Sequence, residues 1–284
     1  MPPAAPARAG VPRWDITARS RPGRLPGVTM AGFGDQANEF REVGLIPHPA
    51  VTVIFDFGDE PFIVEDGRGS RQRDRIVAGL APDGARAQAL ARSSECLQLR
   101  LSPMLAHTAL GACGELGGTV VGLDDLWGRD AVRIQERLRA AGSWLERFAI
   151  AEAALARRDE AGRAVDPEVA FAWGRLVASR GRLRVEQLVA EIGWSRKRLW
   201  SRFRAQVGLT PKRAAQLIRF DHAAHRLAAG HRAAVVAAAG GYADQSHLHR
   251  DVMAFTGMTP ATIAGSPFLA VDEVAWPLAP STGG

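Results

Sequence analysis

The stretch GWSRKRLWSRFRAQVGLTP at positions 193–211 decides how the C-terminal part of this 284-residue chain folds. It joins a glycine turn, a cationic amphipathic segment and a second glycine that is followed by Thr-Pro. The pattern returns as GYADQSHLHRDVMAFTGMTP at 241–260, with Leu199 and Leu248 at equivalent positions 49 residues apart. A helix, a turn and a second helix, present twice, predict two helix-turn-helix units. This favours a protein that binds duplex DNA over an enzyme.

The first unit is expected to begin with a helix over 185–192. Gly193 supplies the turn, because a tight turn between helices often needs a positive φ. Ser195 is the expected N-cap of the next helix, which covers 196–204 and places Leu199 toward the core. Its outward face is cationic and suits the major groove, although a charged face that is only solvated stays open as the alternative.

A long helix is predicted to connect the two units. Thr210 is its expected N-cap, Pro211 occupies its first position, and apolar residues continue to Leu227, which makes a rigid strut. The second unit begins with a helix over 233–239, and Asp244 is the expected N-cap of its recognition helix.

The basic excess lies in this same part of the chain. Residues 167–270 contain fifteen Lys and Arg against six Asp and Glu, a net charge of +9, whereas the remaining residues have a net charge of −3. This distribution is typical of a surface that binds phosphates.

Residues 29–125 are predicted to be rich in β-strand. Four segments with dense β-branched or aromatic residues, separated by Gly and Pro, are the expected strands: 51–57, 61–64, 75–80 and 96–101. The last strand alternates apolar and polar residues, so we expect one of its faces to be in solvent. Several short strands of this kind predict a small sandwich or barrel.

Helices are expected after these strands. Ser102-Pro103 begins one that extends to about residue 112, and a long helical stretch runs from about 124 to 158. Two interpretations of its apolar face stay open, packing on the strands or dimerisation. A polar segment at 161–166 is the predicted linker.

The remaining features exclude several classes of protein. Residues 1–28 form a predicted disordered arm without the apolar run of a secretory signal, and no segment is apolar enough to span a membrane. Cys96 and Cys113 are predicted to be buried, reduced thiols, with His107 isolated from them, so no metal or cofactor is proposed. We expect a cytoplasmic protein that does not contact membranes.

Several motifs together resemble the AraC/XylS family of bacterial transcription regulators. They are Gly193-Trp194-Ser195, Pro211-Lys212, Arg219-Phe220, the run 241–248 and Gly257-Met258-Thr259-Pro260. The resemblance covers about 167–265 and implies an all-α DNA-binding domain over 167–268, with a tail over 269–284. It also implies two recognition helices in successive major-groove segments, about 34 Å apart.

The resemblance assigns site residues by position. The implied base contacts are Lys197, Trp200, Ser201, Gln245, Ser246, His249 and Arg250. The expected phosphate contacts are Arg196, Arg198, Arg202, Arg204, Lys212, Arg213 and Arg219. Two departures from the family weaken parts of this set. Ser201 stands where many members have arginine, and Met253-Ala254 replaces a commonly basic pair.

The N-terminal half, 29–160, is similar to the cupin-like sensor half of some members of this family. Three segments carry this resemblance: 49–55, 99–103 and 115–118. It implies effector binding or dimerisation, so the predicted fold is α+β, a β-rich sensor domain followed by an all-α domain.

The sequence therefore predicts a sequence-specific transcription regulator that binds promoter DNA and is modulated by a small-molecule effector. RNA polymerase is a further partner if the protein activates transcription, and a homodimer is a further state. Two alternatives stay open. One is a DNA-repair protein that accepts an alkyl group on Cys96 or Cys113, and the other is a non-specific architectural protein.

Overall fold

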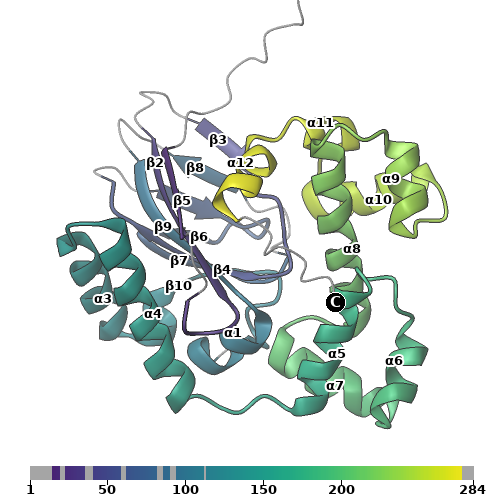
Figure 1. Cartoon of the computed structure of the whole chain (residues 1–284), viewed down its shortest axis with the longest axis horizontal. Coiled ribbons are helices and arrows are strands. Elements are labelled where there is room, and N and C mark those ends of the chain that lie inside the picture. Colours follow the sequence, from purple (N-terminus) through teal and green to yellow (C-terminus); the bar gives the residue numbers. More distant parts are fainter. Residues whose placement is uncertain are drawn as a thin grey trace, which may run out of the picture.

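The structure is a computed structural model, and it describes residues 15–19, 23–35, 41–58, 62–81, 86–89, 94–111 and 113–276. These residues form an N-terminal domain of strands and helices (15–161) and a helical C-terminal domain (167–265). A last helix, α12, lies between the two domains (Figure 1). The mixed α+β class predicted from the sequence is confirmed.

The N-terminal domain is built on two antiparallel sheets. In spatial order, sheet A consists of β1 (Asp15–Ala18), β2 (Val28–Asp35), β9 (Ser94–Leu101), β4 (Val51–Asp56), β7 (Arg75–Ala78) and β10 (Val120–Gly122). Sheet B consists of β3 (Arg41–Gly44), β8 (Arg86–Ala89), β5 (Phe62–Glu65) and β6 (Arg71–Arg73). All four strands predicted from the sequence are present, with ends that differ by a few residues.

The two faces of sheet A bury different side chains, because successive residues of a strand point to opposite faces. Val53, Phe55 and Leu99 belong to the larger apolar cluster, which continues into the covering helices. Ile54 and Ile76 belong to a second cluster, which also contains residues of β5 in sheet B. Sheet A is therefore covered on one face by helices and on the other by sheet B.

The prediction that one face of the strand at 96–101 lies in solvent is wrong. Leu97, Leu99 and Leu101 are buried on the helix side, as the alternation indicated. The alternate residues Gln98 and Arg100 line a cavity on the side of sheet A that faces sheet B. Polar residues alternate in β9 because they face an internal cavity.

The predicted disordered arm over 1–28 also needs correction at its C-terminal end. Residues Asp15–Ala18 form the edge strand β1, which pairs with β2 in the register Ile16 to Phe33. The chain beyond β1 is fixed by Glu152 of the helical layer, which accepts hydrogen bonds from the Arg19 side chain and the Leu25 amide at 2.7 and 3.1 Å. The part of the arm before residue 15 lies outside the described residues.

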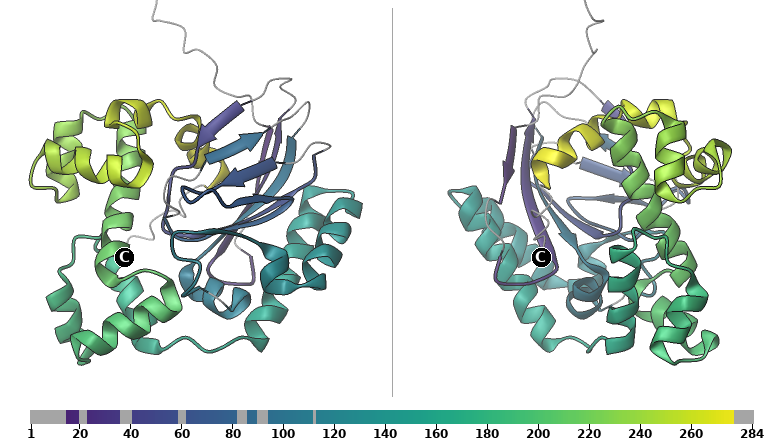
Figure 2. Two further views of the ribbon diagram at one scale, coloured as in Figure 1. Left: turned by 180° about the vertical axis from the view of Figure 1, so that it is seen from behind. Right: turned by 45° about the vertical axis from the view of Figure 1, so that its right-hand side comes forward.

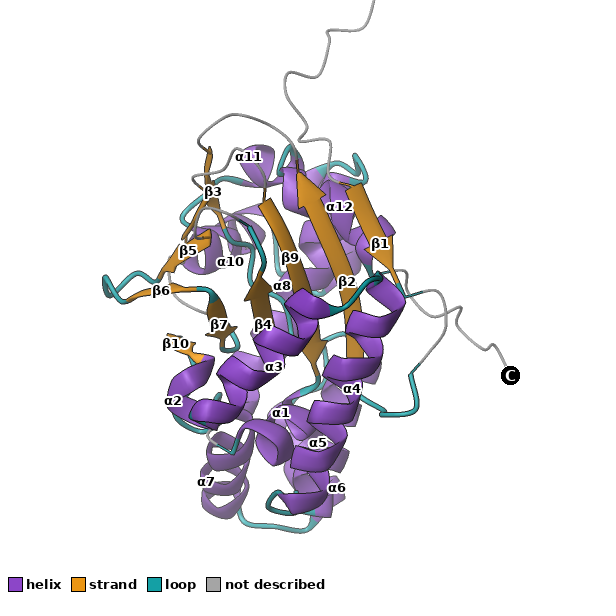
Figure 3. Ribbon diagram, turned by 90° about the vertical axis from the view of Figure 1, so that its left-hand side faces the viewer, coloured by secondary structure: helices purple, strands orange, loops and turns teal. Residues whose placement is uncertain are grey.

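The helices of this domain are α1 (Pro103–Leu110), α2 (Leu123–Trp127), α3 (Arg129–Ala140) and α4 (Trp144–Ala161). The single long helical stretch predicted over 124–158 is thus three helices, because Gly128 at φ 57° and the 141–143 turn interrupt it. Figure 3 shows α3 and α4 lying across sheet A. Of the two interpretations of their apolar face, the structure shows packing on the strands: Ile134 and Leu155 are buried there with Phe55.

The C-terminal domain contains α5 (Pro167–Ala178), α6 (Val185–Ile192), α7 (Arg196–Val207), α8 (Pro211–Ala228), α9 (Ala233–Gly240), α10 (Gln245–Thr256) and α11 (Pro260–Ala264). Residues 162–166 connect it to α4. The predicted helix over 185–192 matches α6, and α8 begins at Pro211 with Thr210 as its N-cap, as predicted. Figure 1 shows α8 connecting the α6–α7 unit to the α9–α10 unit.

Residues 269–275 of the expected C-terminal tail instead belong to α12 (Pro267–Ala275), and the tail from 277 onward lies outside the described residues. This helix contacts β1 and β2 of the N-terminal domain and α8 of the C-terminal domain (Figure 2). Leu269 and Ala275 are buried there. The sequence-based boundary at 268 is placed inside a helix, because the contacts that hold α12 come from distant parts of the chain.

The two domains also meet at a close backbone contact. Gly208 ends α7 with φ 86°, and a Cβ atom at this position would lie 2.4 Å from the Cys113 carbonyl oxygen. Across the contact, a Cβ on Gly117 would lie 2.1 Å from the Gly208 carbonyl oxygen. Only residues without a side chain allow the N-terminal domain to approach α7 this closely.

Candidate nucleic-acid interface

The two predicted recognition helices, α7 and α10, begin and end in the same way. Ser195 caps α7 by accepting a hydrogen bond from the Arg198 amide, and Asp244 caps α10 by accepting one from the His247 amide. Each helix ends at a glycine in the left-handed region, Gly208 at φ 86° and Gly257 at φ 67°. The sequence repeat is therefore a repeat of local structure, since caps and turns depend on near neighbours in the chain.

Both helices bury one face and expose the other. Leu199 and Phe203 of α7 are fully buried, as are Leu248 and Val252 at the equivalent positions of α10. The exposed residues among the implied base contacts are Lys197, Ser201, Gln245, Ser246, His249 and Arg250. The inward residues fix the rotation of each helix, and that rotation leaves these polar side chains on the outside.

Trp200 is the exception among the implied base contacts. It is half-buried and packs against the core of the domain. The guanidinium of Arg196 lies over its ring, 4.9 Å from the ring centroid. In this structure Trp200 is thus a packing residue that also supports a cation.

The first turn of α7 carries three cations, Arg196, Lys197 and Arg198, and no acidic residue. Cations at a helix N-terminus oppose the helix macrodipole, at a cost of about 0.3–1 kcal/mol each. The Arg198 guanidinium lies 4.2 Å from the centroid of the Trp194 ring, so cation–π contact holds it in place. A bound polyanion would offset this unfavourable arrangement.

Two of the expected phosphate contacts have protein partners instead. Arg202 forms two hydrogen bonds, of 2.6 and 2.7 Å, with Asp166, and this contact lowers the pKa of the Asp166 carboxyl. Arg219 pairs with Asp251 at 2.8 Å, and both side chains are largely buried. These pairs connect α7 to the start of α5 and α8 to α10, which argues against a phosphate-binding role for either arginine.

The other expected phosphate contacts differ in exposure. Arg204 and Lys212 are exposed, whereas Arg213 is half-buried with its guanidinium 3.9 Å from the Phe255 ring centroid. Arg196 and Arg198 are exposed beside their tryptophan rings. The cationic surface of the first unit, defined as Arg196, Lys197, Arg198, Arg204 and Lys212, is therefore available to a ligand.

The second unit presents a more neutral surface. Gln245, Ser246 and His249 are exposed on α10, and Arg250 is the exposed cation among its predicted contacts. The Nε atom of Arg250 donates a 3.4 Å hydrogen bond to the Ser246 carbonyl, one turn earlier in the helix. Met253, where the family commonly has a basic residue, is 38% exposed. The two units thus have the same arrangement of capped helices, but their exposed surfaces differ in charge.

A shallow groove follows the exposed face of α7. Lys197, Trp200 and Arg204 form one wall, and Gly114 and Glu115 of the N-terminal domain contribute to the other. The N-terminal domain therefore lies beside the first recognition helix and brings a carboxylate next to its cations.

Neither cysteine has the environment of a reactive nucleophile. Cys96 and Cys113 are both free and buried, as predicted. Burial raises the pKa of each thiol to about 12, whereas activated thiolates have a depressed pKa. The alkyl-acceptor alternative therefore has no support at either residue.

The described residues contain neither a metal-binding group nor a membrane-spanning helix. Among the described residues of 15–276, no group of three or more His, Cys, Asp or Glu side chains is placed to hold a metal ion. No helix in the same part of the chain has both the length and the hydropathy needed to cross a membrane.

A buried polar cluster, which the sequence did not single out, connects α8 to α12 and β9. His225 of α8 contacts Asp272 of α12 through Nε2 at 3.1 Å, and Arg100 of β9 donates a 2.7 Å hydrogen bond to the same carboxylate. Asp221 and His48 complete the cluster. The alternating polar residues of β9 were the only sequence signal for it.

The charged groups of this cluster shift one another's pKa values. Burial lowers the pKa of His225, but its hydrogen bond to Asp272 and the charge of Asp221 outweigh this and raise the pKa to about 9. Burial disfavours ionised Asp272, yet His225 and Arg100 lower its pKa to about 2. Desolvation and the charge of Arg100 lower the pKa of His48 to about 3. At neutral pH the cluster holds charged His225, Asp272 and Arg100 beside neutral His48. Burial raises the pKa of Asp221 to about 6, so most of this carboxyl is also ionised at that pH.

We expect this cluster to make stability depend on pH above neutrality. Because the pKa of His225 is raised from 6.5 to about 9, its stabilising contribution is complete below pH 6.5 and is lost as the pH rises through 9. The unfolding midpoint of the wild type should therefore fall over this window by more than that of His225→Gln. Thermal unfolding of both proteins between pH 6 and 10 gives the comparison. Parallel profiles would contradict the assignment.

Comparison with known proteins gives one family match. Residues 188–265 match the family model of a helix-turn-helix domain. No curated protein sequence matches the chain. Among solved structures, ToxT from Vibrio cholerae O395 is similar with a TM-score of 0.49 and 10% identity, covering 86% of this chain and 98% of that one.

Two further solved structures are similar over smaller parts. The AraC-like transcriptional activator CuxR has a TM-score of 0.30 and 13% identity, covering 67% of this chain and 79% of its own. A cupin domain from Bordetella pertussis Tohama I has a TM-score of 0.22 and 10% identity, covering 32% of this chain and 95% of its own.

The family match and the doubled, equally capped helix pairs together define the class of the C-terminal domain. It is a helix-turn-helix domain with two units joined by α8. The resemblance stated from the sequence is confirmed: this domain is of the AraC type, a DNA-binding domain of transcription regulators.

Proposed function

We propose that this protein is a sequence-specific transcription regulator that binds promoter DNA with α7 and α10 in successive major-groove segments. One observation carries the proposal. Both helices bury equivalent apolar residues and expose polar side chains, and they belong to two units connected by α8. A strut of this kind suits contacts about one turn of duplex apart, roughly 34 Å.

The proposed contacts follow from exposure. The residues that remain as base contacts are Lys197, Ser201, Gln245, Ser246, His249 and Arg250. Trp200 is half-buried and lines the groove beside α7, so we keep it only as a partial contact. The residues that remain as phosphate contacts are Arg196, Arg198, Arg204 and Lys212. Arg213 is half-buried, so we expect it to contribute less to phosphate binding. Arg202 and Arg219 leave the set because they pair with Asp166 and Asp251.

The direct test is an electrophoretic mobility shift with the purified full chain. The probe is the region upstream of its own gene, with shuffled DNA of the same composition as control. At low salt we expect a shifted complex, and competition by the specific fragment well above that by shuffled DNA. Failure to shift any upstream fragment would count against the proposal, and equal competition would favour an architectural protein.

Arg250 offers a test of base readout. We expect Arg250→Ala to weaken binding by about 1–3 kcal/mol and to relax specificity at one base pair, as loss of a bidentate contact to guanine does. Binding to an operator and to its single-base variants measures this. Arg133→Ala, at an exposed arginine of α3, is the matched control. An equal loss on all sequences would identify Arg250 as a phosphate contact.

The unequal charge of the two units predicts unequal salt dependence. Removing Arg204 and Lys212 together should reduce the slope of log affinity against log salt by about two, because each phosphate contact contributes about one. Gln245→Ala together with His249→Ala should lower affinity and leave the slope unchanged. Titrations from low to moderate salt measure both variants. Equal slopes for the two double variants would show that the first unit does not contribute more than the second to the electrostatic part of DNA affinity.

We further propose that a small molecule modulates this activity through the N-terminal domain. The supporting observation is a cavity between sheets A and B with apolar walls and a few polar groups, the usual composition of a small-molecule site. Comparing operator affinity with and without a bound ligand tests this part of the proposal.

A further inference from the structure

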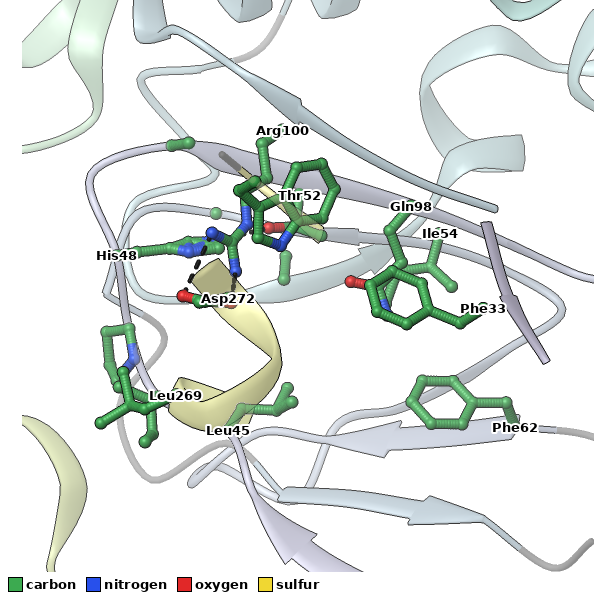
Figure 4. A pocket seen from close by; sticks show the side chains of 16 residues that line it. Phe33, Leu45, His48, Thr52, Ile54, Phe62, Gln98, Arg100, Leu269 and Asp272 are labelled. Carbon is green, nitrogen blue, oxygen red and sulfur yellow. Dashed lines mark hydrogen bonds and ion pairs between the residues drawn. The ribbon is translucent and has the colours of Figure 1, made fainter. Parts of the chain in front are cut away.

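The cavity of the N-terminal domain is closed on one side by α12. Phe33, Ile54 and Phe62 form apolar walls from both sheets, and Leu269 and Asp272 of α12 face them (Figure 4). With α12 in place the cavity measures about 80 Å³. Sites for drug-sized ligands are roughly 300–1,000 Å³, so a ligand of that size needs the space that α12 occupies.

Arg100 is the cation of this cavity, and α12 supplies its anion. Its Nη2 and Nη1 atoms lie 2.7 and 3.3 Å from the two oxygens of Asp272. The ring of Trp276, the residue after α12, lies 4.3 Å from the guanidinium carbon. Both side chains of the ion pair are mostly buried, 19% and 10% exposed. Arg100 therefore has an anion partner in an apolar space, and that partner comes from the end of the described chain.

Two buried nitrogen atoms beside this ion pair have no hydrogen-bond partner. They are Nε of Arg100 and Nδ1 of His48. The other ring nitrogen of His48, Nε2, lies 3.0 Å from the Thr52 hydroxyl. A buried donor without a partner is costly, and Nε of Arg100 is such a donor, so the Asp272 carboxylate satisfies this polar site incompletely. A different anion, one not held by a helix, can contact more of the available nitrogens.

We propose that the cavity is a binding site for a small carboxylate with an apolar body, and that Asp272 occupies the carboxylate position when no ligand is bound. The ligand and α12 then exclude each other. The ligand carboxylate takes over Arg100, its apolar body lies against Phe33, Ile54 and Phe62, and α12 leaves the sheet.

The charge balance favours an anion over a neutral ligand. If α12 left without replacement, Arg100 would be a buried unpaired charge, which is strongly unfavourable. A carboxylate restores this pair, so Arg100 keeps an anionic partner throughout the exchange. A neutral ligand of the same shape cannot form an ion pair with Arg100. Its binding must therefore break the Arg100–Asp272 ion pair without replacing it.

The exchange also reaches the DNA-binding domain. Asp272 bonds His225 of α8, the strut between the two helix-turn-helix units, so α12 joins cavity and strut in one polar cluster. When α12 leaves, His225 keeps only Asp221, at 3.7 Å, among its acidic contacts. An effect of this exchange on DNA binding rests on the proposed function, whereas binding of the carboxylate to the cavity does not.

Isothermal titration of the full chain without DNA tests the proposal. The probe is 4-phenylbutanoate, with 4-phenylbutan-1-ol as its neutral counterpart. We expect the carboxylate to bind at least about tenfold more tightly than the alcohol, as a charge-assisted contact requires. Asp272→Asn should tighten carboxylate binding by about tenfold or more, because it removes the internal competitor. Arg100→Gln should weaken it by a similar factor.

Opposite effects from the two partners of one ion pair distinguish a binding site from a structural salt bridge. Asp130→Asn, at an exposed aspartate of α3, is the matched control and should change nothing. If Arg100→Gln does not fold, Arg100→Lys provides a second variant. It keeps the positive charge but loses the bidentate contact, so it should bind the carboxylate with intermediate affinity. Hydrogen exchange over 269–276 should become faster when the carboxylate binds.

The proposal fails if neither the wild type nor Asp272→Asn binds the carboxylate, if carboxylate and alcohol bind equally, or if exchange in α12 slows on binding. Because the titration contains no DNA, these results are separate from the proposed function. If the protein binds its operator but not the carboxylate, only the proposal for the cavity is overturned. If it binds the carboxylate but no operator, only the proposed function as a transcription regulator is overturned.

Discussion

Gly208→Ala is expected to destabilise the protein by about 1–3 kcal/mol more than Gly257→Ala, although the two glycines occupy equivalent positions of the repeat. Both end a recognition helix with a positive φ, 86° and 67°, so both variants bear the cost of a left-handed alanine, about 1–2 kcal/mol. Only Gly208 faces the N-terminal domain, where the new Cβ would lie 2.4 Å from the Cys113 carbonyl oxygen.

Urea unfolding followed by circular dichroism measures the difference, and a third variant separates its causes. Gly117 lies across the same contact at a φ outside the left-handed region, and its Cβ would meet the Gly208 carbonyl. Gly117→Ala should therefore show the cost of the clash without the cost of the backbone conformation. At Gly257 no atom lies within 4 Å of the added Cβ. Equal losses for Gly208→Ala and Gly257→Ala would show that the two domains do not pack as described.

Arg219→Met is expected to lower the free energy of unfolding by about 3 kcal/mol, because it leaves Asp251 as a largely buried charge without its partner. The Arg219 guanidinium lies 2.8 Å from the Asp251 carboxylate and 4.6 Å from the Tyr242 ring centroid. These contacts hold α10 and the preceding turn on α8. The variant should weaken DNA binding indirectly, by releasing the second recognition helix.

The slope of DNA affinity against salt distinguishes this role from the phosphate contact expected from the sequence. A structural arginine leaves the slope nearly unchanged when it is removed, while a phosphate contact lowers it by about one and leaves stability intact. Arg175→Met, which breaks the exposed pair with Glu191, is the matched control and should unfold like the wild type. A double-mutant cycle with Asp251→Asn isolates the energy of the pair itself. No coupling would contradict the structural role.

The DNA-binding frame could be predicted because its signals are local. Ser195 and Asp244 lie three residues before the amides they cap, and the buried leucines lie at helical spacing from their apolar neighbours. Such interactions connect residues within one or two turns, and sequence periodicity records them directly. The same argument explains why Thr210 and Pro211 marked the start of the strut.

The roles of individual arginines could not be predicted in the same way. Arg202 and Arg204 belong to the same cationic run, but only Arg202 meets Asp166, 36 residues earlier in the chain. Arg219 meets Asp251, 32 residues later. A charge and its partner at such a separation leave no periodic pattern, so sequence alone assigns all the arginines to the same surface.

The amino-acid sequence by itself therefore determined the two helix-turn-helix units, their caps and turns, and the unequal charge of their recognition helices. The tertiary structure alone decided which cations remain exposed, why Gly208 and Gly257 are not equivalent, and that Gln98 and Arg100 face a cavity. It also decided that residues 267–275 form a helix closing that cavity. The physical reason is separation along the chain: Arg100 and Asp272 meet across 172 residues, and only the folded arrangement of sheet, strut and helix brings them together.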